Sequence, residues 1–223
     1  MSYEEALRAI NIGIDMVREV KEEGYDIVGV GEMGIGNTTT SSAVLASLIN
    51  CNIEDVVGKG GGLTEEAFEK KKEVIKRAIE INSPDINNPI DIVAKVGGFD
   101  LAGMVGVFLG CAYYKVPVVI DGFISAVAAL VAIKLCEDVK GYLISSHFSK
   151  ELGYIIAMKE IGLEPMLNLD MRLGEGSGCP IAFSVVSYAC AMMNNMATFS
   201  EAEIDPSYLE EVRGKENYIV DTK

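Results

Sequence analysis

Apolar residues recur every three or four positions near the start of the chain, between Ser2 and Glu23. This spacing places them on one face of a helix. Ser2 and Glu5 have the spacing of a capping box, and Gly24 follows the last apolar position. The pattern therefore predicts an amphipathic helix from Ser2 to Glu23.

Beyond this helix, short apolar runs alternate with longer helical patterns. The runs that predict strands are residues 26–30, 117–120, 142–145 and 165–169. The segments that predict further helices are residues 38–50, 64–81, 101–114, 125–136, 149–161 and 180–196. Such alternation predicts an α/β fold, a Rossmann-like and mostly parallel sheet with helices on both faces. We expect one domain spanning residues 1–223.

Composition narrows the class of partner. Of the 223 residues, 49% are hydrophobic, which is enough for a sizeable core, and the formal net charge is −14. An acidic surface argues against nucleic acid or an anionic membrane as partner. We therefore expect small molecules or other protein chains as partners.

The cysteines and the apolar segments predict a soluble, cytoplasmic protein. The five cysteines are odd in number and contain no CxxC pair, so they are typical of reduced thiols. The first residues carry glutamates where an export signal would carry positive charge. The longest apolar stretch, residues 123–133, is shorter than the roughly 20 residues of a membrane span.

Four polar or glycine-rich loops follow the predicted strands. In parallel sheets, ligands bind at the carboxyl ends of the strands, so we expect these loops to form one site. Their sequences are GEMGIGNTTT from Gly31, DGFIS from Asp121, SSHFS from Ser145 and DMRLGEGSG from Asp170.

The first loop is typical of a turn that holds a phosphate. Glycines at positions 31, 34 and 36 allow positive φ and close approach of a ligand. The hydroxyls of Thr38–Thr40 are expected to cap the helix that follows, whose N-terminus attracts anions. Glu32 would repel a phosphate, so it indicates chemistry on another part of the ligand.

Other motifs fit this chain less well. Gly29, Gly31 and Gly34 fit GxGxxG, with Asp55 further on, but Glu32 would occupy the path of a pyrophosphate. A Walker A loop is excluded because no Gly-Lys-Ser/Thr follows the glycines. His147 is the single histidine and is interpreted as structural, so we expect neither a metal site nor a cofactor.

Seven segments in order carry a resemblance that covers almost the whole chain. They are GEMGIGNTTT, GKGGGLTEEAFEKKKEVIKRAI, GGFDLAGMVGVFLG, VPVVIDGFISAVAAL, SSHFSKELG, LDMRLGEGSG and NMATFSEA. Together they resemble nicotinate-nucleotide:dimethylbenzimidazole phosphoribosyltransferases. The resemblance implies transfer of the phosphoribosyl group of nicotinate mononucleotide to a base such as dimethylbenzimidazole, which gives α-ribazole phosphate and nicotinate in cobalamin biosynthesis.

The resemblance also implies roles for individual residues. Glu175, between Gly174 and Gly176, matches the general base, and Glu32 matches the second active-site carboxylate. Two carboxylates in one site would raise each other's pKa, which suits a proton acceptor. Lys71, the middle of three consecutive lysines, matches a phosphate contact.

Further substrate contacts are expected in the glycine loops. Backbone N–H groups of Gly34, Gly61 and Gly62 would reach the phosphate or ribose. Arg172 would face the nicotinate carboxylate, and Leu173, Gly174 and Gly176 would contact substrate beside it. Ser149 and Asp121 are candidates from their loop positions.

One departure from the family concerns the start of the chain. Family members begin upstream, with a segment that contributes to the pocket for the base, whereas Met1 here precedes the first predicted helix. We expect a homodimer or a second chain that supplies this segment. A catalytically inactive nucleotide-binding or regulatory subunit that needs a partner chain remains the alternative function.

Overall fold

The computed structural model describes residues 1–59, 62–205 and 207. Contacts within the chain group into two compact units, Met1–Phe183 and Ser184–Lys223. The expectation of one domain therefore stays a prediction, and each unit is described by itself.

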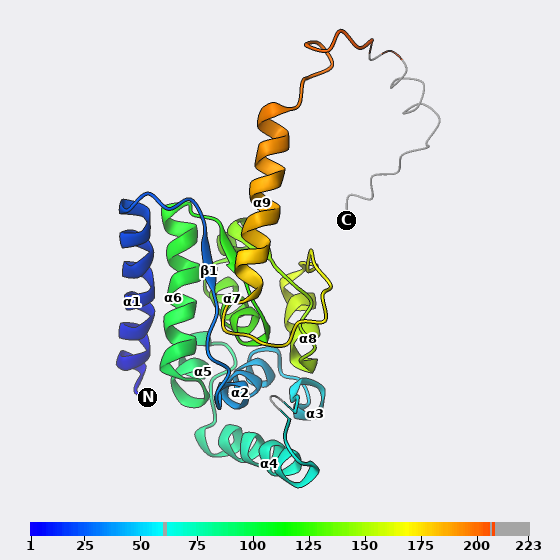
Figure 1. Cartoon of the computed structure of the whole chain (residues 1–223). Helices are drawn as coiled ribbons and strands as arrows, with labels where there is room; N and C mark the ends of the chain where they lie inside the picture. The colour runs from blue at the N-terminus through cyan, green and yellow to red at the C-terminus, as the bar shows by residue number, and fades with distance from the viewer. Residues whose placement is uncertain (60–61, 206, 208–223) are drawn as a thin grey trace. The chain divides into compact units, whose positions relative to one another are not determined.

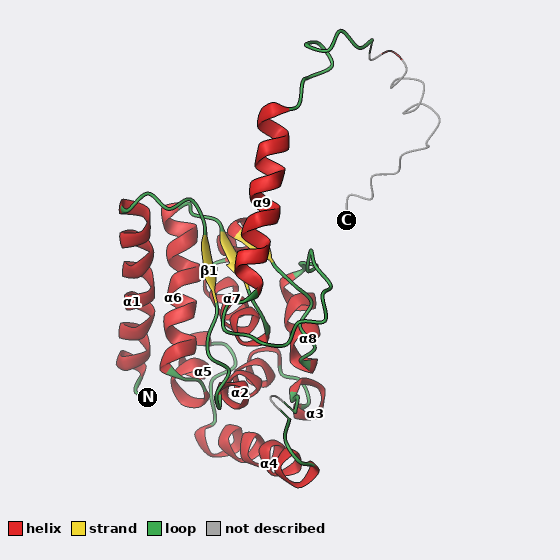
Figure 2. Cartoon of the chain, viewed as in Figure 1, coloured by secondary structure: helices red, strands yellow, loops and turns green. Residues whose placement is uncertain are grey.

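Helices make up most of the first unit, around a small sheet (Figures 1 and 2). The strands are β1 (Val28–Val30), β2 (Val118–Ile120) and β3 (Leu143–Ser145). The helices before β2 are α1 (Tyr3–Glu22), α2 (Asn37–Ile49), α3 (Ile53–Val56), α4 (Glu65–Asn82), α5 (Pro89–Val96) and α6 (Phe99–Tyr114). After β2 come α7 (Phe123–Leu135), a 3-10 helix (Glu137–Tyr142), α8 (Leu152–Ile161) and the start of α9 (Gly178–Asn195).

The sheet is parallel in the order β1-β2-β3, with Val28, Val118 and Leu143 in register. Residues at this register position face the main core, which α6 and α7 also line. The opposite face, with Val119 at its centre, packs against Cys179 and Ala182 in the first turns of α9. The predicted α/β class, parallel sheet and helices on both faces are thus confirmed.

The capping signals at the helix starts are confirmed where they were strongest. Ser2 and Glu5 form the reciprocal capping box of α1, and Gly24 follows the helix with φ +84°. Two short helices, α3 and α5, were not expected. Asn88 caps α5 through its side chain, and Pro89 occupies the first turn.

The predicted strand at residues 165–169 is wrong. Only Leu167 pairs, in one isolated parallel bridge with His147. Its N–H donates to Ser146 O (3.1 Å) and its carbonyl accepts from Phe148 N (2.7 Å). A single pairing does not extend β3, so this segment runs as a loop toward residues 170–178.

α1 and α6 lie side by side (Figure 1). A Cβ on Gly106 would lie 1.9 Å from Ile10 O, so the glycine permits this close packing of the two backbones. In the second unit, the rest of α9 is followed by a turn in which Thr198 N donates to Glu201 Oε2 (2.8 Å).

Candidate functional site

The loop between β1 and α2 folds around the side chain of Glu32. Its carboxylate accepts hydrogen bonds from Gly34 N and from Asn37 Nδ2 (2.7 Å). Asn37 Nδ2 also donates to Asp100 Oδ2 (2.9 Å), at the start of α6. The Gly34 N–H predicted to meet substrate is therefore engaged by Glu32 in this structure.

The expected capping of α2 by threonine hydroxyls is wrong. The N-cap is Gly36, with φ +80°, and no side chain caps the helix among the described residues. Thr40 Oγ1 instead donates to Asn37 O (3.0 Å), and Thr38 Oγ1 accepts from Lys71 Nζ (3.0 Å). The start of α2 thus presents backbone N–H groups without a side-chain cap, a feature that favours anion binding.

The glycine loop around Glu175 lies directly against the loop around Glu32. Glu175 N donates to Glu32 O (2.8 Å). A Cβ on Gly31 would lie 2.3 Å from Gly176 Cα, so Gly31 is needed for close approach rather than for positive φ. The structure therefore brings together the two carboxylate-bearing loops, which are more than a hundred positions apart in the sequence.

Glu175 has an unusual backbone conformation. Its φ is +57°, and Gly174 and Gly176 on either side have φ of +75° and +73°. A glutamate in the left-handed region is strained, and such strain clusters at functional sites. The side chain of Glu175 is exposed.

Asp121 anchors the Glu175 loop from below. It follows β2, is 1% exposed, and accepts from Gly176 N (3.1 Å) and Gly178 N (2.7 Å). His147 Nδ1 lies 3.9 Å from Asp121 Oδ1 and 3.1 Å from Ser146 Oγ. The ends of β2 and β3 thus support the loop that carries Glu175.

Lys71 is the buried member of its lysine run. It is 8% exposed, whereas Lys70 is exposed and Lys72 pairs with Glu69 (2.7 Å) on the surface of α4. Its ammonium donates to Thr38 Oγ1 and to Gly58 O, both at 3.0 Å. The cation therefore lies beside the first turn of α2.

Burial raises the pKa of Glu32 above its usual 4.5, with smaller contributions from Asp121 and Asp100. The hydrogen bonds from Asn37 and Gly34 act in the opposite direction. The expectation that Glu175 would be the main cause is wrong, because desolvation dominates. A carboxyl with a raised pKa suits a group that handles protons or charge near neutral pH.

The remaining predicted residues are less closely tied to this cluster. Ser149 is 6% exposed, between β3 and α8. Arg172 and Leu173 are exposed on the loop before Glu175. Gly62 is exposed with φ +107°, and Gly61 lies outside the described residues.

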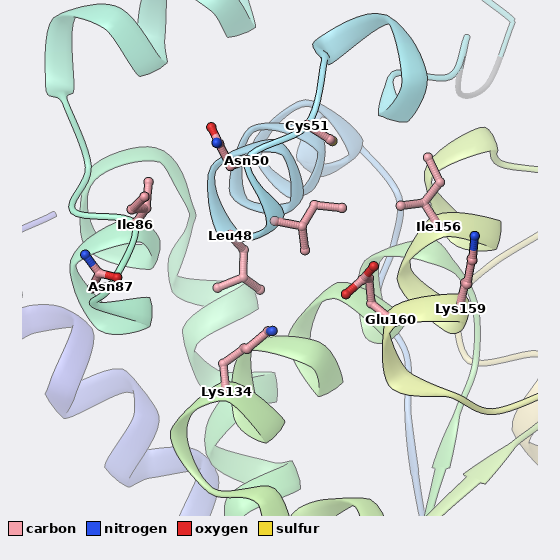
Figure 3. Close-up of a pocket in the computed structure, with 10 residues that line it drawn as sticks. Leu48, Asn50, Cys51, Ile86, Asn87, Lys134, Ile156, Lys159 and Glu160 are labelled. Carbon is pink, nitrogen blue, oxygen red and sulfur yellow. The ribbon is translucent and has the colours of Figure 1, made fainter.

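The cavity in Figure 3 lies away from these residues. It measures about 580 Å³ and is lined by residues that include Leu48, Asn50 and Cys51 at the end of α2, Lys134 of α7 and Lys159 of α8. α2 has 13 residues, so this end is about 20 Å from the Glu32 loop. The cavity contains none of the predicted site residues.

Comparison with known proteins identifies the family. A family model described as phosphoribosyltransferase matches residues 1–204. A nicotinate-nucleotide–dimethylbenzimidazole phosphoribosyltransferase of Clostridium perfringens is 60% identical over 220 residues. The chain belongs to the nicotinate-nucleotide–dimethylbenzimidazole phosphoribosyltransferase family. Its relative in Clostridium acetobutylicum is 52% identical over 206 residues.

A solved structure of the family has the same fold. CobT from Thermus thermophilus is 36% identical, with a TM-score of 0.86, and the match covers 92% of this chain. The chain spans 61% of that structure, 61% of the Clostridium perfringens phosphoribosyltransferase and 58% of the Clostridium acetobutylicum one. From 92% to 99% of this chain lies within the matches to these two curated relatives.

Two residues of this family member have structural roles that the sequence did not reveal. Asn37 connects Glu32 to Asp100, and Thr38 holds Lys71. The only signal for them was their membership of the run NTTT. The sequence pattern assigns the threonines of that run to capping, which is a local role, whereas both partners lie far away in the sequence.

Metal ions and membranes find no binding element in the part of the chain that the structure describes. Within the described ranges, no three His, Cys, Asp or Glu side chains are grouped so as to hold a metal ion. Among the helices that the structure describes, none has the length and apolar character needed to cross a membrane.

Proposed function

We propose that this chain transfers the phosphoribosyl group of nicotinate mononucleotide to a lower-ligand base such as dimethylbenzimidazole, giving α-ribazole phosphate and nicotinate in cobalamin biosynthesis. The observation that carries the proposal is the pairing of the two carboxylate loops, Glu175 N to Glu32 O at 2.8 Å. Family membership supports the same reaction.

In the proposed reaction, a ring nitrogen of the base attacks the anomeric carbon while the bond from that carbon to nicotinate breaks. Glu175 accepts the proton that the azole nitrogen loses, a role that its exposed carboxylate suits. Glu32 stabilises the positive charge that develops on the ribose. Both residues act from loops that are fixed to each other.

The remaining groups bind the nucleotide. The 5′-phosphate meets Lys71 and the uncapped start of α2. Arg172 pairs with the nicotinate carboxylate, and Leu173, Gly174 and Gly176 line the ribose side of the loop. Ser149, Gly34, Gly61 and Gly62 complete the contacts that we propose.

Incubation of the purified protein with nicotinate mononucleotide and a panel of bases tests the reaction, with nicotinate release as the readout. Glu175→Gln should lower turnover by about 10²- to 10⁴-fold, because general base catalysis is lost. The matched control is Glu164→Gln, an exposed glutamate after α8, which should leave turnover unchanged.

The variant also separates catalysis from simple binding. Calorimetry should find the affinity of Glu175→Gln for nicotinate mononucleotide close to that of the wild type. Nucleotide binding without nicotinate release by the wild type, whatever the base, would instead support the inactive binding subunit.

We also propose that the protein acts in the cytoplasm and assembles, as a homodimer or with a second chain. The described cysteines are all free thiols, which supports a reducing compartment. Large apolar side chains are exposed on one face of α9 at Val185, Tyr188, Met192 and Met196, at 38%, 69%, 61% and 70%. An apolar face of this kind supports an interface, whose stoichiometry light scattering measures.

A further inference from the structure

Glu151 is a buried carboxylate to which the proposed reaction gives no role. It immediately precedes α8, but its side chain does not cap that helix. Its Oε2 is shielded from solvent and has no hydrogen-bond partner among the described residues. An unpaired buried carboxylate is costly, so a nearby positive charge is expected to compensate for it.

The positive charge near Glu151 is Lys71, on the other side of Gly58. A Cβ on Gly58 would lie 2.1 Å from Glu151 Oε2, so the carboxylate packs directly against this glycine. The carbonyl of the same glycine accepts a hydrogen bond from Lys71 Nζ (3.0 Å). Gly58 thus separates the two charges, and they interact without a direct ion pair.

Burial and charge act in opposite directions on both groups. Burial lowers the pKa of Lys71, and the Glu151 carboxylate partly restores it. Burial raises the pKa of Glu151, and the Lys71 ammonium partly restores it. Each group therefore favours the charged form of the other, and the loss of one charge destabilises the remaining one.

We propose that Glu151 is a positioning residue of the phosphate site, which holds the Lys71 ammonium beside the first turn of α2. The inference rests on the proposed function, in which Lys71 and this turn bind the 5′-phosphate. Glu151 itself touches no substrate. It lies on the Gly58 side of the ammonium and Thr38 on another, so an anion at α2 meets the cation first.

Comparison of two ligands that differ only in the phosphate tests the proposal. We would measure the affinities of nicotinate mononucleotide and of nicotinate riboside by calorimetry. Glu151→Gln should bind the mononucleotide roughly tenfold more weakly and the riboside as well as the wild type does. A merely structural role, such as holding the loop in shape, would weaken both ligands alike.

A double-mutant cycle tests whether Glu151 acts through Lys71. In the background of Lys71→Met, the change Glu151→Gln should cause no further loss. The matched control, Glu164→Gln, replaces an exposed glutamate and should bind both ligands like the wild type. An additional tenfold loss in the Lys71→Met background would overturn the proposal, as would unchanged mononucleotide affinity of Lys71→Met or of Glu151→Gln.

Gly58→Ala provides a second variant that keeps both charges. Its new methyl group displaces the carboxylate, and the Gly58 backbone is outside the left-handed region, so alanine adds no backbone strain. The same selective loss of mononucleotide affinity is expected, and unchanged affinity would contradict the proposal. Failure of nicotinate release in the wild type would overturn the proposed reaction, whereas this binding cycle would still decide the role of Glu151.

Discussion

Replacing Asp121 by asparagine tests how the loop of Glu175 is held in place. Asp121 is 1% exposed, and its two oxygens accept from Gly176 N (3.1 Å) and Gly178 N (2.7 Å). Asparagine offers one oxygen, and its amide NH₂ would face the other backbone N–H. The variant therefore loses one hydrogen bond and leaves a buried donor without a partner.

The expected size of this effect follows from the two bonds. A hydrogen bond to a charged group contributes about 1.5–3 kcal/mol, and an unsatisfied buried donor costs a similar amount. We expect a loss of about 2–3 kcal/mol in the free energy of unfolding. In a protein of this size, that loss lowers the midpoint of thermal unfolding by about 4–12 °C.

Hydrogen exchange can locate the effect on the loop. The amides of Gly176 and Gly178 should exchange faster in Asp121→Asn, and kcat/KM for nicotinate release should fall by roughly 30- to 100-fold if the same free energy is needed to restore the loop. Asp138→Asn, an exposed change in the 3-10 helix, is the matched control. Wild-type exchange at both glycine amides would refute the idea that Asp121 anchors this loop.

Two further predictions concern the same region. Gly31→Ala should abolish nicotinate release because its Cβ would lie 2.3 Å from Gly176 Cα, whereas Gly103→Ala, which meets open space in α6, should be neutral or stabilise by about 1 kcal/mol. Wild-type turnover of Gly31→Ala would show that the two loops need not touch. Burial lowers the pKa of His147 below its usual 6.5, with Asp121 acting in the opposite direction. As pH falls below 6.5 the unfolded chain takes up a proton before the folded one, so stability is lost on acidification. Urea midpoints at about pH 7.5 and about pH 5.5 should differ less in His147→Gln than in the wild type, and equal differences would contradict this.

Strong local patterns predicted the elements well, and weak ones did not. The helix after Ser2 and the strand ending at Ile120 were predicted within a few residues, because an amphipathic stripe and a buried apolar run are local properties. Residues 165–169 have a similar apolar run but find only one pairing residue, Leu167. Strand formation depends on a partner, which the sequence of the segment does not contain.

The candidate site shows the same division. The loops that carry Glu32 and Glu175 stood out because glycines flank a carboxylate in each. The anchoring of one loop by Asp121 and the pairing of Lys71 with Thr38 were not foreseen, because these contacts join residues that are distant in the sequence.

The sequence by itself determined the α/β class, the family and the two loops that carry the carboxylates, because periodicity, glycine flanks and ordered motifs are properties of the chain. Only the tertiary structure decided which lysine is buried, which N–H groups remain open at α2, and that burial rather than Glu175 raises the pKa of Glu32. Burial and hydrogen bonding depend on what packs around a group in three dimensions, and here those neighbours come from separate parts of the chain.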